Sequence, residues 1–151
     1  MKGELTKKDL AACVDCACFN VRKAARVITQ NFDEIMQPSG LRATQFTILV
    51  MIASSDAATM SELADKLVMD RTTLTRNLKP LQEQGLIKDV SGADRRTRSI
   101  NLTGKGRGML LKTLPLWKKA QARMTRYLGE QRFAGLLGEL RSFERLTASL
   151  R

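Results

Sequence analysis

The chain has 151 residues, the length of one domain or of a small module with a dimerising frame. A hydrophobic content of 43% excludes global disorder, and an aromatic content of 5% argues against binding single-stranded nucleic acid through stacked bases. The 26 lysines and arginines outnumber the 15 aspartates and glutamates, so the chain has a net charge of +11 and attracts polyanions. Nucleic acid and an anionic membrane surface both fit this charge.

The sequence predicts neither a signal peptide nor a membrane anchor. The first ten residues are charged and do not lead into a clean apolar run. The longest apolar block, residues 46–53, is far shorter than the roughly 20 residues that span a bilayer. We therefore expect a cytoplasmic protein with no membrane partner, in a compartment where thiols stay reduced.

The first third of the chain predicts two helices. Apolar residues recur at three- and four-residue spacing from about residue 8 to residue 36, which gives one stripe along a helix. The sequence Gln37-Pro38-Ser39-Gly40 then breaks this helix. Residues 43–54 are apolar on most sides, so we expect a second, buried helix there.

The central segment predicts two short helices joined by a tight turn. Thr59 precedes Glu62 by three residues, which is the capping-box pattern at the start of a helix, and this helix ends near Leu67. A turn follows, and Asp70 is suited to cap a helix over residues 71–84.

A hairpin and two further helices complete the chain. Residues 86–90 and 98–102 are strand candidates, with a turn at residues 91–93. Thr103 can cap a helix that reaches about residue 128, and a last helix is expected over residues 130–149. Two helices followed by a hairpin form a winged helix-turn-helix, so the predicted fold class is mainly α with a small β-wing.

The predicted organisation is a single domain with a DNA-binding part in its middle, residues 41–103, which we call the reader. Residues 41–103 form the winged helix-turn-helix part, and residues 5–36 and 104–151 form helices at the two ends. These outer helices are more apolar than a reader of this size can cover. A symmetric homodimer that packs the terminal helices together would bury them.

The helix over residues 71–84 has two chemically distinct faces. At 100° per residue, Leu74, Leu78 and Leu81 lie within about 60° of one another and form the packed face. The opposite side has hydroxyl and cationic side chains that bond phosphates and base edges, whereas an ordinary solvated face more often mixes glutamate with lysine. The residues predicted to contact DNA are Thr72, Thr73, Thr75, Arg76 and Lys79.

The tip of the predicted wing is rich in arginine. One carboxylate among several guanidiniums can fix the loop and leave other arginines to reach outward. A narrow minor groove attracts such arginines through its negative potential, and a solvated charged turn is the alternative. The residues predicted to contact DNA from the wing are Asp94, Arg95, Arg96 and Arg98.

Over about residues 10–147 the chain resembles the MarR family of bacterial regulators. The motifs that carry the resemblance are Leu63-Ala64, the helix from Asp70 to Gln84, Gly85-Leu86-Ile87, Asp94-x-Arg96 with Leu102-Thr103, Gly40-Leu41 with Gln45-Phe46, and Leu116-Trp117. Arg42 departs from the family pattern, which often has a threonine or serine that caps the second helix.

The resemblance implies an all-helical homodimer with a small wing. It implies binding to a pseudo-palindromic operator in double-stranded DNA as a transcriptional regulator, usually a repressor. It assigns the wing pair to Asp94 and Arg96, with Arg96 in the minor groove. It assigns the groove-reading positions to Thr72, Thr73, Thr75 and Arg76. It also suggests a cleft between the dimer frame and the reader for a small aromatic or anionic effector.

Three cysteines lie at positions 13, 16 and 18, and the chain has no histidine. In one regular helix Cys16 lies about 160° from Cys18, with Cys13 between them, so three thiols cannot bind one metal ion, and Zn²⁺ would lack a fourth ligand. We therefore predict no metal and no cofactor. Core or interface thiols are the preferred interpretation. Oxidation sensing through Cys13 or Cys16, including a disulfide across the dimer, is the alternative.

Together these features favour a sequence-specific DNA-binding transcriptional regulator, a repressor released by a small molecule or by oxidation. A winged-helix protein-interaction module without DNA binding is the alternative, although the cationic helix face and wing disfavour it. An enzyme is not expected, because the sequence has no glycine-rich phosphate loop, no paired carboxylates and no nucleophile with its base.

Overall fold

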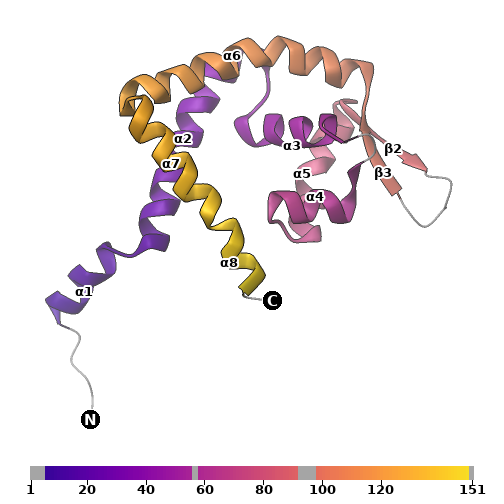
Figure 1. The fold of residues 1–151 in the computed structure, drawn as a ribbon. Coiled ribbons are helices and arrows are strands. Elements are labelled where there is room, and N and C mark those ends of the chain that lie inside the picture. The colour runs from indigo at the N-terminus through magenta and orange to yellow at the C-terminus, as the bar shows by residue number, and fades with distance from the viewer. Residues whose placement is uncertain (1–5, 56–57, 92–97, 150–151) are drawn as a thin grey trace.

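The computed structural model describes residues 6–55, 58–91 and 98–149. Its helical elements are α1 (Lys7–Val14), α2 (Ala17–Met36), the 3₁₀ turn η1 (Gln37–Ser39), α3 (Ala43–Ala53), α4 (Met60–Leu67), α5 (Arg71–Glu83), α6 (Gly104–Leu128), α7 (Glu130–Ser142) and α8 (Glu144–Ser149). Its strands are β1 (Ala58–Thr59), β2 (Ile87–Ser91) and β3 (Arg98–Leu102). A mainly helical chain with a small sheet confirms the predicted fold class (Figure 1).

The three strands form an antiparallel sheet in the order β1-β3-β2. β2 and β3 pair over five residues, with Ile87 opposite Leu102, close to where the sequence predicts the hairpin strands. β1 pairs Ala58 with Ile100 and was not predicted, because two residues are too short to show a periodic pattern. Since β1 leads directly into α4, this pairing joins the helix-turn-helix to the hairpin.

The core lies among α3, α4, α5 and the sheet. Leu74, Leu78 and Leu81 on α5 are each no more than 2% exposed, which confirms the predicted packed face. They belong to a buried apolar cluster with Leu41, Ile48, Leu49, Ile52, Ala58, Leu63, Ala64, Leu86, Ile87 and Ile100. Burial of these leucines fixes the rotation of α5, so its other side faces outward.

α6 is a 25-residue helix along one edge of the molecule, and α3 lies between it and α4 (Figure 1). Thr103 caps α6 as predicted, because its Oγ1 accepts a hydrogen bond from the Gly106 N–H at 3.0 Å. The ring of Phe46 on α3 stacks against Trp117 on α6, with 6.1 Å between the ring centroids. α6 therefore packs on α3 and connects the reader to α7 and α8.

The helix predicted over residues 8–36 is two helices, so the prediction of one continuous helix is wrong. The break falls at Asp15 and Cys16, where Cys16 has an extended backbone. Asn20 stabilises the break, because its Nδ2 donates to the carbonyl oxygens of Val14 (2.8 Å) and Cys16 (3.0 Å). The last predicted helix is divided in the same way, into α7 and α8 at Phe143.

The start of α3 explains the departure of Arg42 from the family pattern. Position 42 is the N-cap residue, and its own side chain makes no cap hydrogen bond. Instead the Ala43 N–H donates to Asp33 Oδ1 on α2 at 2.6 Å, and the Arg42 N–H donates to Gln45 Oε1 at 3.0 Å. A carboxylate from the preceding helix thus replaces the missing threonine or serine.

The terminal helices leave many apolar side chains exposed. α1 extends away from the body, and α7 and α8 descend from the far end of α6 (Figure 1). Their exposed apolar side chains, with those of α2 and the end of α6, are Leu10, Val14, Phe19, Val21, Val27, Tyr127, Leu140, Phe143 and Leu146. None of the helices described is long and apolar enough to cross a membrane.

Candidate nucleic-acid interface

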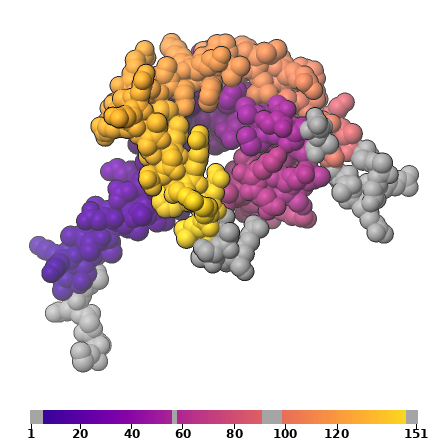
Figure 2. Space-filling view, in the orientation of Figure 1, coloured from indigo at the N-terminus to yellow at the C-terminus, as the bar shows by residue number. Residues whose placement is uncertain are grey.

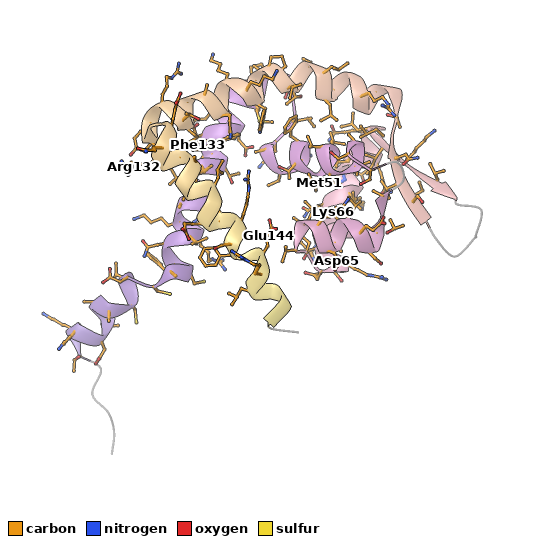
Figure 3. All side chains as sticks on the ribbon, viewed as in Figure 1. Met51, Asp65, Lys66, Arg132, Phe133 and Glu144 are labelled. Carbon is orange, nitrogen blue, oxygen red and sulfur yellow. The ribbon has the colours of Figure 1, made fainter. Side chains whose placement is uncertain are left out.

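The turn between α4 and α5 sets the direction of α5. The capping box predicted at the start of α4 is present, with the Glu62 N–H donating to Thr59 Oγ1 at 3.2 Å and the Thr59 N–H donating to Glu62 Oε2 at 2.9 Å. At the other end of α4, Val68 adopts a left-handed backbone (φ 50°) that reverses the chain. Lys66 on α4 also reaches back to the end of α3, where its Nζ donates to Ser55 Oγ at 3.1 Å (Figure 3).

Asp70 caps α5, as predicted. Its Oδ1 accepts from the Thr73 N–H at 2.8 Å, and its Oδ2 accepts from the Thr73 hydroxyl at 2.6 Å. This double hydrogen bond lowers the pKa of the Asp70 carboxyl, mainly through the Thr73 side chain. Thr73 is therefore half-buried against the cap and has already donated its hydroxyl hydrogen.

The outward side of α5 carries four of the five residues predicted for it. Thr72, Thr75, Arg76 and Lys79 are all exposed. The Thr75 hydroxyl donates to the Arg71 carbonyl at 2.8 Å, so its methyl group and oxygen remain available. Such a surface offers cationic donors, hydroxyl oxygens and a methyl group, the groups that contact phosphates, base edges and thymine methyls.

The outward side of α5 has a positive electrostatic balance. Lys79 lies 3.9 Å from Glu83, and because both side chains are well exposed this pair contributes little. Over the residues described here, no carboxylate lies within ion-pair distance of Arg76. Its guanidinium is therefore available for a bidentate contact.

Arg71 is a candidate contact that the sequence reasoning missed. It is the first residue of α5, where the positive end of the helix dipole disfavours a cation. The stability of α5 therefore does not explain an arginine at this position. Its Nη2 donates to Ser61 Oγ on α4 at 2.6 Å. This bond joins the two helices of the motif and leaves other guanidinium donors exposed. The signal in the sequence was an arginine directly after the capping aspartate.

The far end of α5 is fixed by α6. The carbonyl oxygen of Gln84 accepts a hydrogen bond from Lys105 Nζ at 2.7 Å, and the Gly85 carbonyl accepts from Thr103 Oγ1 at 2.7 Å. Cations stabilise helix C-termini, so Lys105 contributes charge as well as a hydrogen bond. A helix that reads DNA must be held rigidly, and here both of its ends are bonded to neighbouring helices.

The helix caps predict an acid-sensitive fold. Like Asp70, Glu62 and Asp9 have a lowered pKa, through hydrogen bonds from Thr59 and Thr6 respectively. In the acid range the unfolded chain therefore binds more protons than the folded chain, so the ionised caps stabilise the fold. This stabilisation is present above the ordinary pKa values of 3.8 and 4.5 and is lost as the pH falls through the lowered pKa values of the folded chain.

We therefore expect the urea midpoint of unfolding to fall as the pH drops below the ordinary carboxyl pKa values of 4.5 and 3.8. Asp70→Asn should lower the midpoint near neutral pH and flatten its dependence in the acid range, because an amide cannot titrate. Urea titrations followed by circular dichroism at several pH values would measure both. An unchanged acid dependence in the variant would contradict the role of Asp70.

The predicted wing contacts fall largely outside the described residues. Asp94, Arg95 and Arg96 lie within residues 92–97, which are not described, and so does most of the turn predicted at residues 91–93. Arg98 begins β3, and its backbone pairs with Ser91 of β2. The described strands therefore fix where the wing leaves the sheet, at the end of β2 and β3 away from the α5 C-terminus.

The cysteines are not part of the core. Cys13, Cys16 and Cys18 are all exposed and free in the protomer. The argument from one regular helix does not apply to them, because the chain breaks between α1 and α2. Still, within the described ranges no group of three or more histidine, cysteine, aspartate or glutamate side chains is placed to hold a metal ion.

A cavity of about 610 Å³ lies among α2, α6 and α7, within the outer helices rather than between them and the reader, where the family resemblance suggests an effector cleft. Its walls are mostly apolar, and it has two cations, Lys23 and Arg123. Asn20, which stabilises the α1–α2 break, also lines it. Asn31 contributes an amide whose Oδ1 is buried with no hydrogen-bond partner. The cavity thus offers apolar walls, positive charge and one unused acceptor.

Comparison with known proteins supports the reader geometry. A sequence model described as the MarR family matches residues 39–97. In the solved complex of the M. tuberculosis transcriptional regulator MosR with DNA, the protein is 40% identical to this chain; the match covers 91% of this chain and 99% of MosR, with a TM-score of 0.82.

The chain belongs to the MarR family. Its curated relatives are named as transcriptional regulators. The B. subtilis HTH-type transcriptional regulator YwoH is 29% identical over 55% of this chain, and the B. subtilis organic hydroperoxide resistance transcriptional regulator is 28% identical over 59%. The matched region is 61% of the length of each of these two relatives. In MarR-family terms, α4 and α5 form the helix-turn-helix, and β2 and β3 form the wing.

Proposed function

We propose that this chain is a homodimeric, sequence-specific regulator of transcription that binds double-stranded DNA and acts in the cytoplasm as a repressor, with no catalytic role. The observation that carries the proposal is the outward side of α5, where Arg76 and exposed threonines lie opposite three buried leucines. The 40% identity to a regulator solved in complex with DNA supports it.

In this proposal α5 enters the major groove and contacts base edges through Thr72, Thr75 and Arg76. Lys79 and Arg71 contact phosphates at its two ends. The wing lies beside the adjacent minor groove, where Arg96 enters, next to Asp94, Arg95 and Arg98. Thr73 acts indirectly, because its hydroxyl is bonded to Asp70.

The proposed homodimer follows from the uncovered apolar side chains of the terminal helices. Exposed apolar patches of this kind mark interaction surfaces. A second copy of the chain carries the same residues, so a two-fold interface would cover both sets at once. Two readers related by a two-fold axis fit a pseudo-palindromic operator with half-sites roughly 10 bp apart.

Selection of bound sequences from a random duplex pool tests this function directly. We expect enrichment of an inverted repeat and a binding constant that falls with salt, since phosphate contacts release counterions. A chain that enriches no sequence and binds no duplex at low salt would instead fit the protein-interaction module.

A small effector with an apolar body and an acidic group is the proposed release signal. The cavity among α2, α6 and α7 supports a small aromatic or anionic effector, because Lys23 and Arg123 line its apolar walls. Aromatic carboxylic acids that release the operator from the wild type should act more weakly on Lys23→Gln and Arg123→Gln. Equal sensitivity of all three proteins would exclude this cavity as the effector site.

Oxidation is a second candidate release signal, because the three cysteines are exposed rather than buried. An exposed thiol can react with peroxide or with a second thiol, and Cys13 and Cys16 flank the break between α1 and α2. We expect peroxide to produce a disulfide-linked dimer on non-reducing gels and to weaken operator binding. Cys13→Ser and Cys16→Ser show which thiol is responsible. The absence of a shifted band together with unchanged DNA affinity would exclude the switch.

A further inference from the structure

α6 carries positive charge without any negative charge. From Gly104 to Leu128 it contains no aspartate or glutamate, whereas α2 and α7 each mix both signs. Every cation of α6 is exposed: Lys105, Arg107, Lys112, Lys118, Lys119, Arg123 and Arg126. Across the described ranges, no carboxylate forms an ion pair with any of them. The fold of the helix does not account for this charge, because among the described residues only Lys105 of these cations makes a side-chain hydrogen bond, to the Gln84 carbonyl.

Four of these cations follow one another at seven-residue spacing, and the first, Lys105, is bonded to the Gln84 carbonyl. The other three form a line that we call the α6 stripe: Lys112, Lys119 and Arg126. They are spaced by seven residues, so at 100° per residue they lie within about 40° of one another. At 1.5 Å per residue the stripe is about 21 Å long. A single small anion cannot contact a line of this length. A DNA backbone can, because duplex DNA carries one charge per roughly 1.7 Å of its axis.

The α6 stripe is separate from the proposed reading surface, and it adjoins the proposed dimer surface where Arg126 precedes the exposed Tyr127. Figure 1 places α6 on the edge of the reader opposite α4, and Figure 2 shows it as an outer edge of the molecule. Burying unpaired like charges between two copies is costly, so the stripe stays in solvent in the dimer. Most of the exposed apolar side chains lie on α1, α2, α7 and α8, and those of α6, Leu111, Leu114 and Tyr127, lie to the sides of the stripe.

A membrane surface fits α6 less well than DNA. A helix that lies on a membrane needs a broad outward apolar face. The apolar face of α6 is directed inward, with Thr113 and Ala120 fully buried. Outward it carries small residues such as Gly108 and Ala122. Its exposed large apolar side chains are Leu111, Leu114 and Tyr127, and Tyr127 lies about 140–160° around the helix from the other two, so they form no single apolar face.

We propose that the α6 stripe is a second, sequence-independent contact for the phosphate backbone of duplex DNA. This proposal rests on the proposed function in one respect: the operator must first hold the protein on DNA. Further DNA is then present near the stripe at high local concentration. That DNA is either the flank of the operator duplex or a separate duplex. Both sources present the same phosphates.

The test compares the wild type with the triple variant Lys112→Gln/Lys119→Gln/Arg126→Gln. On a random 60-bp duplex we expect the triple variant to bind at least about tenfold more weakly at low salt. Its slope of log K against log salt should be smaller by about 3, since each lost phosphate contact removes about 0.9. On a 20-bp operator without flanks its affinity should stay within about twofold of the wild type, because α5 is unchanged.

A control variant separates the stripe from net charge. Lys7→Gln/Lys8→Gln/Arg141→Gln removes the same charge from exposed positions elsewhere and should bind the random duplex like the wild type. Two further experiments show whether the stripe contacts flanking DNA or a separate duplex. Extending the operator to 60 bp tests flanking DNA, and capture of a labelled random duplex by an immobilised operator complex tests a second duplex.

The proposal is wrong if the triple variant binds the random duplex with wild-type affinity and slope, or if both triple variants weaken equally. It is also wrong if the triple variant loses only binding to vesicles rich in phosphatidylserine. A protein that binds random DNA through the stripe but prefers no operator sequence would support this proposal and contradict the proposed function.

Discussion

Gly106→Ala is expected to destabilise the protein by about 3 kcal/mol, because a side chain there meets backbone on the opposite segment. A Cβ built on Gly106 overlaps the carbonyl oxygen of Leu86. It also lies 3.0 Å from the carbonyl carbon of Leu86 and 3.3 Å from Leu102 Cδ2. The same carbonyl oxygen accepts a hydrogen bond from the Thr103 N–H at 3.0 Å. Pushing α6 away from Leu86 therefore weakens the contacts between the start of α6 and the end of α5.

Gly108→Ala is the matched control. It lies two residues further along the same helix, and a Cβ there has nothing within 4 Å. Alanine should stabilise that position by up to about 1 kcal/mol, since glycine is the weaker helix former. At one protein concentration we expect the melting temperature to fall by about 6–12 °C for Gly106→Ala and to rise slightly for Gly108→Ala. Equal melting temperatures would show that α6 can move away from Leu86 without cost.

Arg76→Ala is expected to weaken operator binding by about 1–3 kcal/mol, which is about 5- to 150-fold in Kd. A bidentate guanidinium contact with a base edge distinguishes sequences, so the preference for the operator over random DNA should fall as well. Competition binding with operator and random duplexes at one salt concentration measures both quantities. Arg76 is exposed, so the melting temperature should stay close to that of the wild type.

Lys79→Ala provides the contrast on the same helix. Its ammonium lies near Glu83 and acts as a point charge, so the variant should bind operator and random DNA more weakly by similar factors. If Arg76→Ala also lowered both affinities equally, Arg76 would contact phosphates rather than bases. If neither variant changed binding, the outward side of α5 would not be the DNA-reading surface.

The sequence predicted the reader well, because its signals are local. Thr59 with Glu62, Asp70 and Thr103 each cap a helix through residues three positions away, and all three caps are present. The burial of Leu74 follows in the same way from the period of a helix that packs on one side.

What could not be predicted depends on contacts between distant residues. Three glycines near the start of α6 look alike in the sequence, and only the approach of Leu86 distinguishes Gly106 from its neighbours. The cap that Asp33 provides for α3 comes from another helix. The break before α2 follows from the bonds that Asn20 makes to Val14 and Cys16, which helical periodicity does not reveal.

Footprinting on a selected operator tests the central claim, that two copies of α5 read one duplex. Each copy should protect one half of an inverted repeat, and the centres of the two protected segments should lie roughly 10 bp, one helical turn, apart. Arg76→Ala should remove both protected segments at a concentration that saturates the wild type. A single protected segment with no repeat, or two segments that persist in Arg76→Ala, would contradict the claim.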